Sequence, residues 1–225
     1  MPETFDQAEM TPLSKQKSNS LTLLVATGNQ KKLKELEALL GDLHIGLLGL
    51  KDFQNLVEVE EDGLTFQENA VKKALGFARQ TGCLTLAEDS GLSIDYLNGE
   101  PGVFSARFAG LEKDDLKNCE KVLESLKNVP DDKRGAAFHC AVALALPDKV
   151  ISVFEKTVSG FISHAMMGDG GFGYDPLFFY PEFGKTFAQV PAEMKHSVSH
   201  RGKALRKLKE FLKEYLRKGP MTKSQ

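Results

Sequence analysis

The chain has 225 residues, of which 41% are hydrophobic and 27% are charged, and its formal net charge is −2. This composition excludes a fibrous or largely disordered protein, and the length allows one sizeable buried core. The small net charge argues against general nucleic-acid binding, and no segment is typical of a membrane span or an export signal. Three cysteines, Cys83, Cys119 and Cys140, lack metal-ligand spacing and lie in or beside apolar stretches, which indicates reduced core cysteines and a cytoplasmic protein.

The pattern predicts one folded domain with an extension at each end. Residues 1–20 lack an apolar segment and mix proline, lysine and acidic side chains, so we expect a disordered N-terminal extension. Strand and helix signals then alternate over residues 21–219 without an internal repeat or a long linker, which indicates a single α/β domain. Residues 220–225 follow Gly219 and are expected to form a flexible C-terminal tail.

The first strong pattern is an apolar strand at residues 21–26 that leads into a lysine-rich amphipathic helix. Gly28 lies at the junction, Asn29 is a good N-cap, and Lys31 and Lys32 fall in the first helical turn. Free backbone N–H groups and lysines at a helix start form an anion site, and a bound phosphate would explain basic residues where acidic ones are normally favoured. The alternative is an ordinary capped surface helix.

The remaining elements indicate a mixed sheet. A short apolar stretch at residues 44–50 precedes an acidic loop, and a capping box at Thr65 and Glu68 opens a helix that stops at Gly82. Further predicted elements are a buried strand at residues 84–87, a helix at 114–127, strands at 136–146 and 150–160, and a helix at 201–217. The two later strands are close enough in sequence for an antiparallel hairpin, whereas the earlier connections are helical.

Two acidic groups are candidates for metal binding and catalysis. Glu88 and Asp89 follow the strand at residues 84–87, and we expect Asp89, at the turn, to enter the site. The acidic loop adds three carboxylates at residues 60–62. Carboxylate oxygens suit Mg²⁺, which usually takes one or two of them together with substrate phosphates. The alternative for the loop is a solvated acidic surface without a ligand.

A glycine-rich loop at residues 168–176 interleaves aromatic side chains with glycine. Phe172 and Tyr174 offer base-stacking surfaces, and Asp175 offers an acceptor for a base edge. Donors near the start of the last helix are Lys195, His200 and Arg201. A structural turn beside a basic helix face is the alternative, but together with the phosphate and metal candidates these segments predict a nucleotide site.

Six segments in order resemble the inosine triphosphate pyrophosphatase family, over roughly residues 21–216. They are residues 26–32, 63–70, 89–92, 101–107, 171–176 and 199–205. The resemblance implies hydrolysis of noncanonical purine nucleoside triphosphates (ITP, dITP or XTP) to the nucleoside monophosphate and pyrophosphate, with Mg²⁺. It also implies an elongated mixed β-sheet flanked by helices, two lobes with an active-site cleft between them, and a homodimer.

The resemblance also implies roles for single residues. It makes Asp89 the proton acceptor and a Mg²⁺ ligand, and Glu60 a second metal ligand, with Glu61 as the alternative alignment. Glu88 stands where many bacterial members have aspartate, and its part in metal binding is left open. The implied substrate-binding residues are Thr27, Gly28, Asn29, Gln30, Lys31, Lys32, Ser90, Phe172, Gly173, Tyr174, Asp175, Lys195, His200 and Arg201.

For selectivity against adenine we expect Arg201 to donate to the oxygen at C6 of the purine, because a buried guanidinium would face an amino donor if ATP bound. Two other functions remain open at this point. One is a purine nucleotide sensor that binds without turnover, and the other is a nucleic-acid-binding module that uses the basic last helix. Asp89 beside an acidic loop favours the enzyme over both.

Overall fold

The structure, a computed structural model, describes residues 21–218, so the extension predicted at residues 1–20 and the tail predicted at 220–225 lie outside the described residues. The strands are β1 (Thr22–Val25), β2 (Gly46–Gly49), β3 (Leu84–Ile94), β4 (Gly135–Leu146), β5 (Lys149–Ile162), β6 (Phe178–Tyr180) and β7 (Lys185–Thr186). The helices are α1 (Gln30–Leu40), α2 (Phe66–Thr81), α3 (Asp115–Ser125), α4 (Ala192–Val198) and α5 (His200–Lys218).

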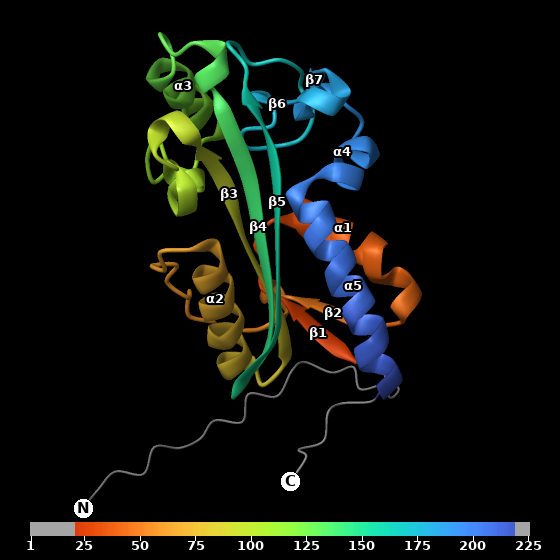
Figure 1. Ribbon diagram of the computed structural model, residues 1–225. Coiled ribbons are helices and arrows are strands. Elements are labelled where there is room, and N and C mark those ends of the chain that lie inside the picture. The colour runs from red at the N-terminus through yellow and green to blue at the C-terminus, as the bar shows by residue number, and fades with distance from the viewer. Residues whose placement is uncertain (1–20, 219–225) are drawn as a thin grey trace, which may run out of the picture.

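One mixed sheet organises the described chain, in the strand order β2-β1-β3-β4-β5-β6-β7. β1 pairs in parallel with β2 and β3, whereas β3, β4 and β5 pair antiparallel, and the predicted β4–β5 hairpin is confirmed. Figure 1 shows an elongated molecule in which β3, β4 and β5 run much of its length, with α2 on one side of them and α5 on the other.

Side chains alternate along these strands and give the two faces of the sheet different surfaces. Mostly large apolar side chains face α1 and α5, and they include Leu23, Val25, Leu84, Leu86, Val142 and Leu144. Smaller side chains dominate the face under α2, where Ala26, Ala87, Ala141, Ala143 and Ala145 are buried. Alanine allows a helix to approach the sheet closely, so side chains on the inner face of α2 reach the strands.

The far end of the long strands carries a separate core, which produces the two predicted lobes. Here β3 and β4 pack with α3 and with the segment around β6, and the buried members include Leu92, Val122, Phe138, Phe178 and Phe187. Figure 1 shows α3, β6 and β7 gathered at the end of the molecule opposite β1 and β2. The long strands belong to both lobes and therefore join them.

The strand predicted at residues 84–87 is too short. β3 continues to Ile94, because its ladder with β4 runs without a break from Thr85 to Ile94. Glu88 and Asp89 therefore lie inside a strand and not at a turn, which corrects the expectation from the sequence. Since successive side chains on a strand point to opposite faces, Asp89 shares the α2 face with Ala87, and Glu88 shares the face of α1 and α5.

Gly91 lets the segment after β3 pack directly on the strand beside these carboxylates. A Cβ atom at this position would lie 2.3 Å from Ser105 Oγ and 2.8 Å from the Gly102 carbonyl oxygen. Ser105 fixes the contact, because its Oγ accepts from the Leu92 N–H at 2.8 Å and donates to the Gly102 carbonyl at 2.6 Å. The glycine after Asp89 and Ser90 is thus required by close packing.

Candidate active site

The start of α1 has the predicted geometry of an anion site. Asn29 is the N-cap, since its Oδ1 accepts from the Lys32 N–H at 3.3 Å, and its own N–H donates to Thr27 Oγ1 at 3.1 Å. Thr27 is half-buried, whereas Gly28, Asn29 and Gln30 are exposed. A Cβ atom at Gly28 would meet no atom within 4 Å, so there is open space over the loop for a ligand. The side chain of Lys31 lies outside the described part of the structure.

A cavity of about 680 Å³ opens at this loop. Its wall combines the α1 loop, the segment after β2, and the inner side of α2, with Lys113 from the segment before α3. The residues that bring charge to it are Lys51, Glu58, Glu61, Lys73 and Lys113. Because Lys113 comes from the far lobe and Thr27 from the near one, the cavity agrees with the cleft predicted between two lobes.

Asp89 faces this side of the sheet and is only partly satisfied. Its Oδ1 accepts from the Ser90 N–H at 2.9 Å, whereas Oδ2 is buried without a well-aligned hydrogen-bond partner among the described residues. Burial raises the pKa of Asp89, the charge of Glu61 adds to the rise, and the neighbouring Asn69 amide and Lys73 charge oppose it. A buried carboxylate with a raised pKa and a free oxygen is suited to accept a proton or to bind a cation.

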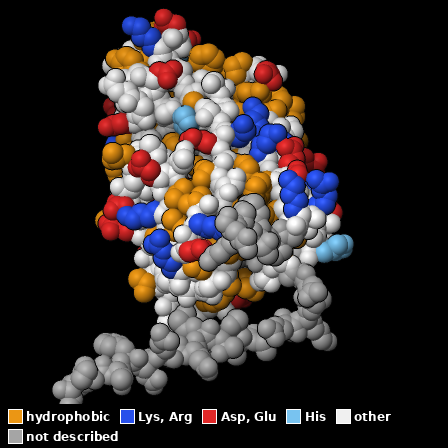
Figure 2. All heavy atoms as spheres, turned by 60° about the horizontal axis from the view of Figure 1, so that its bottom comes forward, with side chains coloured by type: hydrophobic (Ala, Val, Ile, Leu, Met, Phe, Trp, Pro, Cys, Tyr) orange, Lys and Arg blue, Asp and Glu red, His pale blue; other side chains and the backbone are white. Residues whose placement is uncertain are grey.

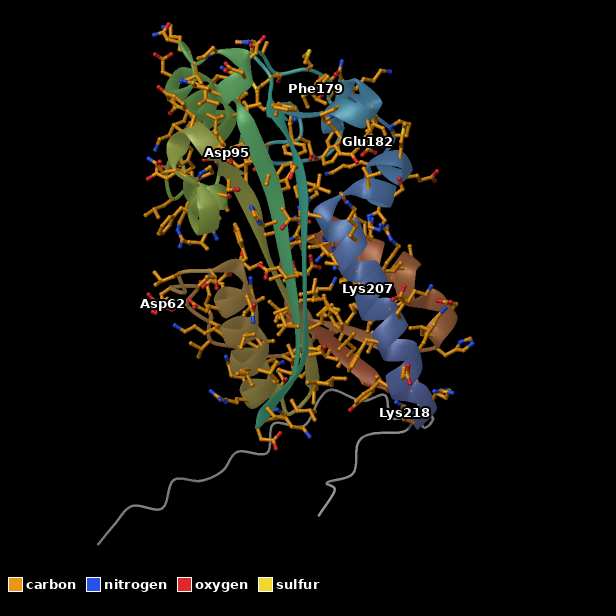
Figure 3. The ribbon with its side chains drawn as sticks, viewed as in Figure 1. Asp62, Asp95, Phe179, Glu182, Lys207 and Lys218 are labelled. Carbon is orange, nitrogen blue, oxygen red and sulfur yellow. The ribbon has the colours of Figure 1, made fainter. Side chains whose placement is uncertain are left out.

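Glu61, and not Glu60, accompanies Asp89. Glu61 is half-buried, its charge acts on Asp89, and its Oε1 lies 2.6 Å from Lys73 Nζ. The side chain of Glu60 is exposed and does not act on Asp89, so of the two alignments left open by the sequence only Glu61 brings a carboxylate to Asp89. Asp62 forms an ion pair with Lys72 and lies at the outer edge of the loop before α2 (Figure 3).

Two carboxylates fit a magnesium site of the kind that substrate phosphates complete. Within residues 21–218 no group of three or more His, Cys, Asp or Glu side chains forms a metal cage. Mg²⁺ often binds through only one or two carboxylates and fills its other positions with phosphate oxygens and water. The buried, unpartnered Oδ2 of Asp89 with Glu61 nearby matches that requirement.

Glu88 lies on the opposite face of β3 and contacts different partners. Arg201 donates two hydrogen bonds to its carboxylate, from Nε to Oε2 at 2.7 Å and from Nη2 to Oε1 at 2.9 Å. Lys32 Nζ lies 3.7 Å from Oε2, and Arg201 Nη1 lies against the Glu35 carboxylate. Burial lowers the pKa of Arg201 to about 10, which leaves the guanidinium charged at neutral pH.

This arrangement changes the interpretation of Arg201. The expected role was donation to the oxygen at C6 of a purine, but the Arg201 side chain is 5% exposed, and its guanidinium is bound to Glu88, to Glu35 and to the Lys32 carbonyl. Sequence alone could not anticipate the bidentate pair, because Glu88 and Arg201 are 113 positions apart. In this structure Arg201 joins elements and does not present its donors to a ligand.

The expected base-side residues form a separate cluster in the far lobe. Lys195 forms an ion pair with Asp175 and lies 4.6 Å from the centre of the Phe172 ring. The Asp175 carboxylate also accepts from the Phe172 N–H at 2.8 Å, and Gly173 donates its N–H to Asp115 Oδ2 at 2.7 Å. Burial raises the pKa of Asp175, and Lys195 opposes the rise. The loop is thus held in one shape with Phe172 half-buried at its edge.

Tyr174 and His200 are the other residues expected on the base side. Tyr174 is buried, and its hydroxyl donates to the Ser105 carbonyl at 2.7 Å. It therefore belongs to the core, and the expectation that it offers a base-stacking surface is wrong. His200 stacks on Phe138, and its Nδ1 has no hydrogen-bond partner in the described chain. Burial, together with the charges of Lys195 and Lys32, places the pKa of His200 well below its usual range.

Sequence reasoning missed Asn69 and Lys73. They lie one helical turn apart on α2 and both affect the pKa of Asp89, and Lys73 lines the cavity. The signal was present, since the spacing of four residues places them on the same side of the helix as the buried Ala70 and Ala74. In the sequence, Asn69 stands in the 63–70 motif of the family resemblance without a role of its own, and Lys73 stands in none of the six motifs.

The basic last helix does not form an isolated positive surface. Lys207 lies 2.8 Å from Glu210, Lys209 lies 2.7 Å from Asp42, and Arg217 lies 3.2 Å from Glu214. On the face shown in Figure 2, Lys and Arg side chains lie beside Asp and Glu side chains. No helix in the described chain is long and apolar enough to cross a membrane. These observations do not favour the nucleic-acid-binding alternative.

Comparison with known proteins finds relatives that are similar over most of this chain. A dITP/XTP pyrophosphatase from Desulforamulus reducens is 50% identical over 192 residues, which cover 85% of this chain and 96% of that protein. A dITP/XTP pyrophosphatase from Listeria monocytogenes is 46% identical over 196 residues, covering 87% and 97%.

Solved structures agree with the fold. A HAM1 protein from Coxiella burnetii superposes with a TM-score of 0.81 at 41% identity, covering 86% of this chain and 99% of the other. A dITP/XTP pyrophosphatase from Mycobacterium abscessus has a TM-score of 0.71 at 41% identity, covering 84% and 97%. The Ham1 family model matches residues 23–211. The resemblance seen in the six sequence motifs is therefore confirmed, and the chain belongs to the Ham1 family.

Proposed function

We propose that the chain hydrolyses noncanonical purine nucleoside triphosphates, such as dITP, XTP and ITP, to the nucleoside monophosphate and pyrophosphate. Relatives at 46% and 50% identity are dITP/XTP pyrophosphatases. The observation that carries the proposal is the half-buried Asp89, whose unpartnered oxygen lies near Glu61 and Lys73. A raised pKa at a cavity is typical of residues in acid–base catalysis, which favours an enzyme over a nucleotide sensor without turnover.

The residues suggest how the reaction proceeds. Asp89 Oδ2 accepts a proton from the water whose oxygen bonds to the α-phosphorus, while the bond to the bridging oxygen breaks and pyrophosphate leaves with the electron pair. The N–H groups at the start of α1, with Lys73 from the cavity wall, stabilise the charge that develops on the leaving group. Mg²⁺ held by Asp89 and Glu61 would neutralise charge on the phosphate oxygens.

The family resemblance also motivates a proposal on assembly and location. The expectation of a homodimer rests on the family resemblance. We expect a homodimer, and the three free cysteines agree with the cytoplasm. Sedimentation equilibrium should give twice the 24.8 kDa chain mass, and the single mass would contradict the dimer.

The bond that is broken can be tested directly. With Mg²⁺ present, ITP, dITP and XTP should each yield pyrophosphate as the first product, and ATP should be a far poorer substrate. Pyrophosphate and orthophosphate are assayed separately over a panel of nucleoside triphosphates. A nucleoside diphosphate with orthophosphate would show attack at the γ-phosphorus and would contradict the proposal.

Replacement of the proposed base should abolish most of the turnover. Asp89→Asn keeps the shape of the side chain but removes the proton acceptor, so kcat for ITP should fall by at least about 100-fold. Steady-state kinetics give kcat, and circular dichroism verifies that the variant is folded. Near-normal turnover by a folded Asp89→Asn protein would assign proton transfer to another group.

The metal position is tested by comparing two adjacent glutamates. Glu61→Gln removes a charge beside Asp89, so the Mg²⁺ concentration for half-maximal activity should rise by at least about 10-fold. Glu60→Gln is the matched control, because this neighbouring side chain is exposed, and its Mg²⁺ dependence should stay close to that of the parent protein. A larger effect at residue 60 than at residue 61 would reverse the assignment.

A further inference from the structure

Glu88 lies one residue from the proposed base but takes no part in its cluster. It is 6% exposed on the face of β3 that packs against α1 and α5, with Arg201 and Lys32 as neighbours. Both of its oxygens accept hydrogen bonds from Arg201 at 2.7 and 2.9 Å. A carboxylate held in this bidentate fashion has a fixed orientation and no free oxygen directed toward the Asp89 side of the sheet.

Arg201 carries this contact to a third element. Its Nη2 also donates to the Lys32 carbonyl at 3.2 Å, and its Nη1 lies against the Glu35 carboxylate, so the guanidinium is attached to the first two turns of α1. Lys32 Nζ, also from α1, lies 3.7 Å from Glu88 Oε2. Two cations and two anions therefore join β3, α1 and α5 at one point, and Glu88 is the only member contributed by the sheet.

We infer that Glu88 is a positioning residue that, through Arg201, fixes the phosphate-binding start of α1 relative to the start of α5; this inference rests on the proposed function. The proposed function has phosphate bind at residues 27–32, the loop and first turn of α1, and His200 at the start of α5 stacks on Phe138 within reach of the Lys195 charge. A nucleotide that is bound at both its triphosphate and its base gains affinity only if the two binding regions lie at the correct distance and angle from each other. We call this relative placement of the starts of α1 and α5 their register. Glu88 maintains it from the face of β3 opposite Asp89.

The experiment compares Glu88→Gln with Glu37→Gln. The first keeps the size of the side chain but removes the charge that orients Arg201, and the second alters an exposed glutamate of α1 as a matched control. Three quantities are measured for each variant: KM and kcat for ITP, and Ki for inorganic tripolyphosphate as a competitor. Tripolyphosphate has phosphates but no base, so its binding should depend on the start of α1 and not on how the start of α5 is placed relative to it.

For Glu88→Gln, KM for ITP should rise by about 10-fold or more, while Ki for tripolyphosphate should change by less than about 3-fold. Glu37→Gln should match the parent protein in both. A merely structural role would reduce the folded fraction, which lowers the apparent kcat and leaves KM unchanged. KM for ITP unchanged in Glu88→Gln, or Ki rising in parallel with KM, would overturn the inference.

A second variant covers the case in which Glu88→Gln does not fold. The Glu35 side chain is 41% exposed, so Glu35→Gln should fold while it removes one of the contacts of Arg201 with α1. It should raise KM for ITP in the same direction by about 3-fold, again without a parallel change in Ki for tripolyphosphate. No change in KM for Glu35→Gln would then overturn the inference.

The outcome also separates this inference from the proposed function. A parent protein that releases no pyrophosphate from ITP would overturn the proposed function, and the inference with it. A parent protein that turns over ITP, with a folded Glu88→Gln variant that behaves like Glu37→Gln, would overturn the inference alone.

Discussion

Side chains on a β-strand alternate between the two faces of the sheet, and in β3 this alternation separates two adjacent carboxylates. Asp89 points toward α2, where a buried oxygen lacks a partner within the described chain, and Glu88 points toward α1 and α5, where Arg201 binds both of its oxygens. A single strand thus supplies the proposed base on one face and an ion-paired glutamate on the other. The strand must continue past both residues for this to hold, and its ladder with β4 ensures that it does.

The face of the sheet under α2 explains how the reactive side is assembled. Alanines at positions 141, 143 and 145 leave room for α2 to lie close to the strands, and the helix brings Asn69 and Lys73 toward Asp89. Partial burial in this setting raises the pKa of Asp89, because it removes water that would stabilise the charged form. Large apolar side chains on the opposite face pack against α1 and α5 and so hold both helices on the sheet.

Much of this architecture could be predicted from local patterns. The capped start of α1 at Asn29, the β4–β5 hairpin and the mixed sheet follow from signals within a few residues. The sequence did not reveal how far β3 extends, because this depends on a ladder with a strand some fifty positions later. The bidentate pair of Glu88 with Arg201 and the burial of Tyr174 are also products of tertiary packing, and each changed the role expected for a residue.

The central claim is that the two neighbouring carboxylates have opposite effects on the folded state. It is tested most directly by the free energy of unfolding of Asp89→Asn and Glu88→Gln, measured by denaturant titration at neutral pH without nucleotide or metal. Burial raises the pKa of both carboxyl groups, but Asp89 Oδ2 has no hydrogen-bond partner in the described chain, so Asp89→Asn should be at least as stable as the parent protein. Removing the partner of a buried guanidinium should destabilise Glu88→Gln by about 3 kcal/mol or more. A destabilised Asp89→Asn together with an unaffected Glu88→Gln would contradict the account.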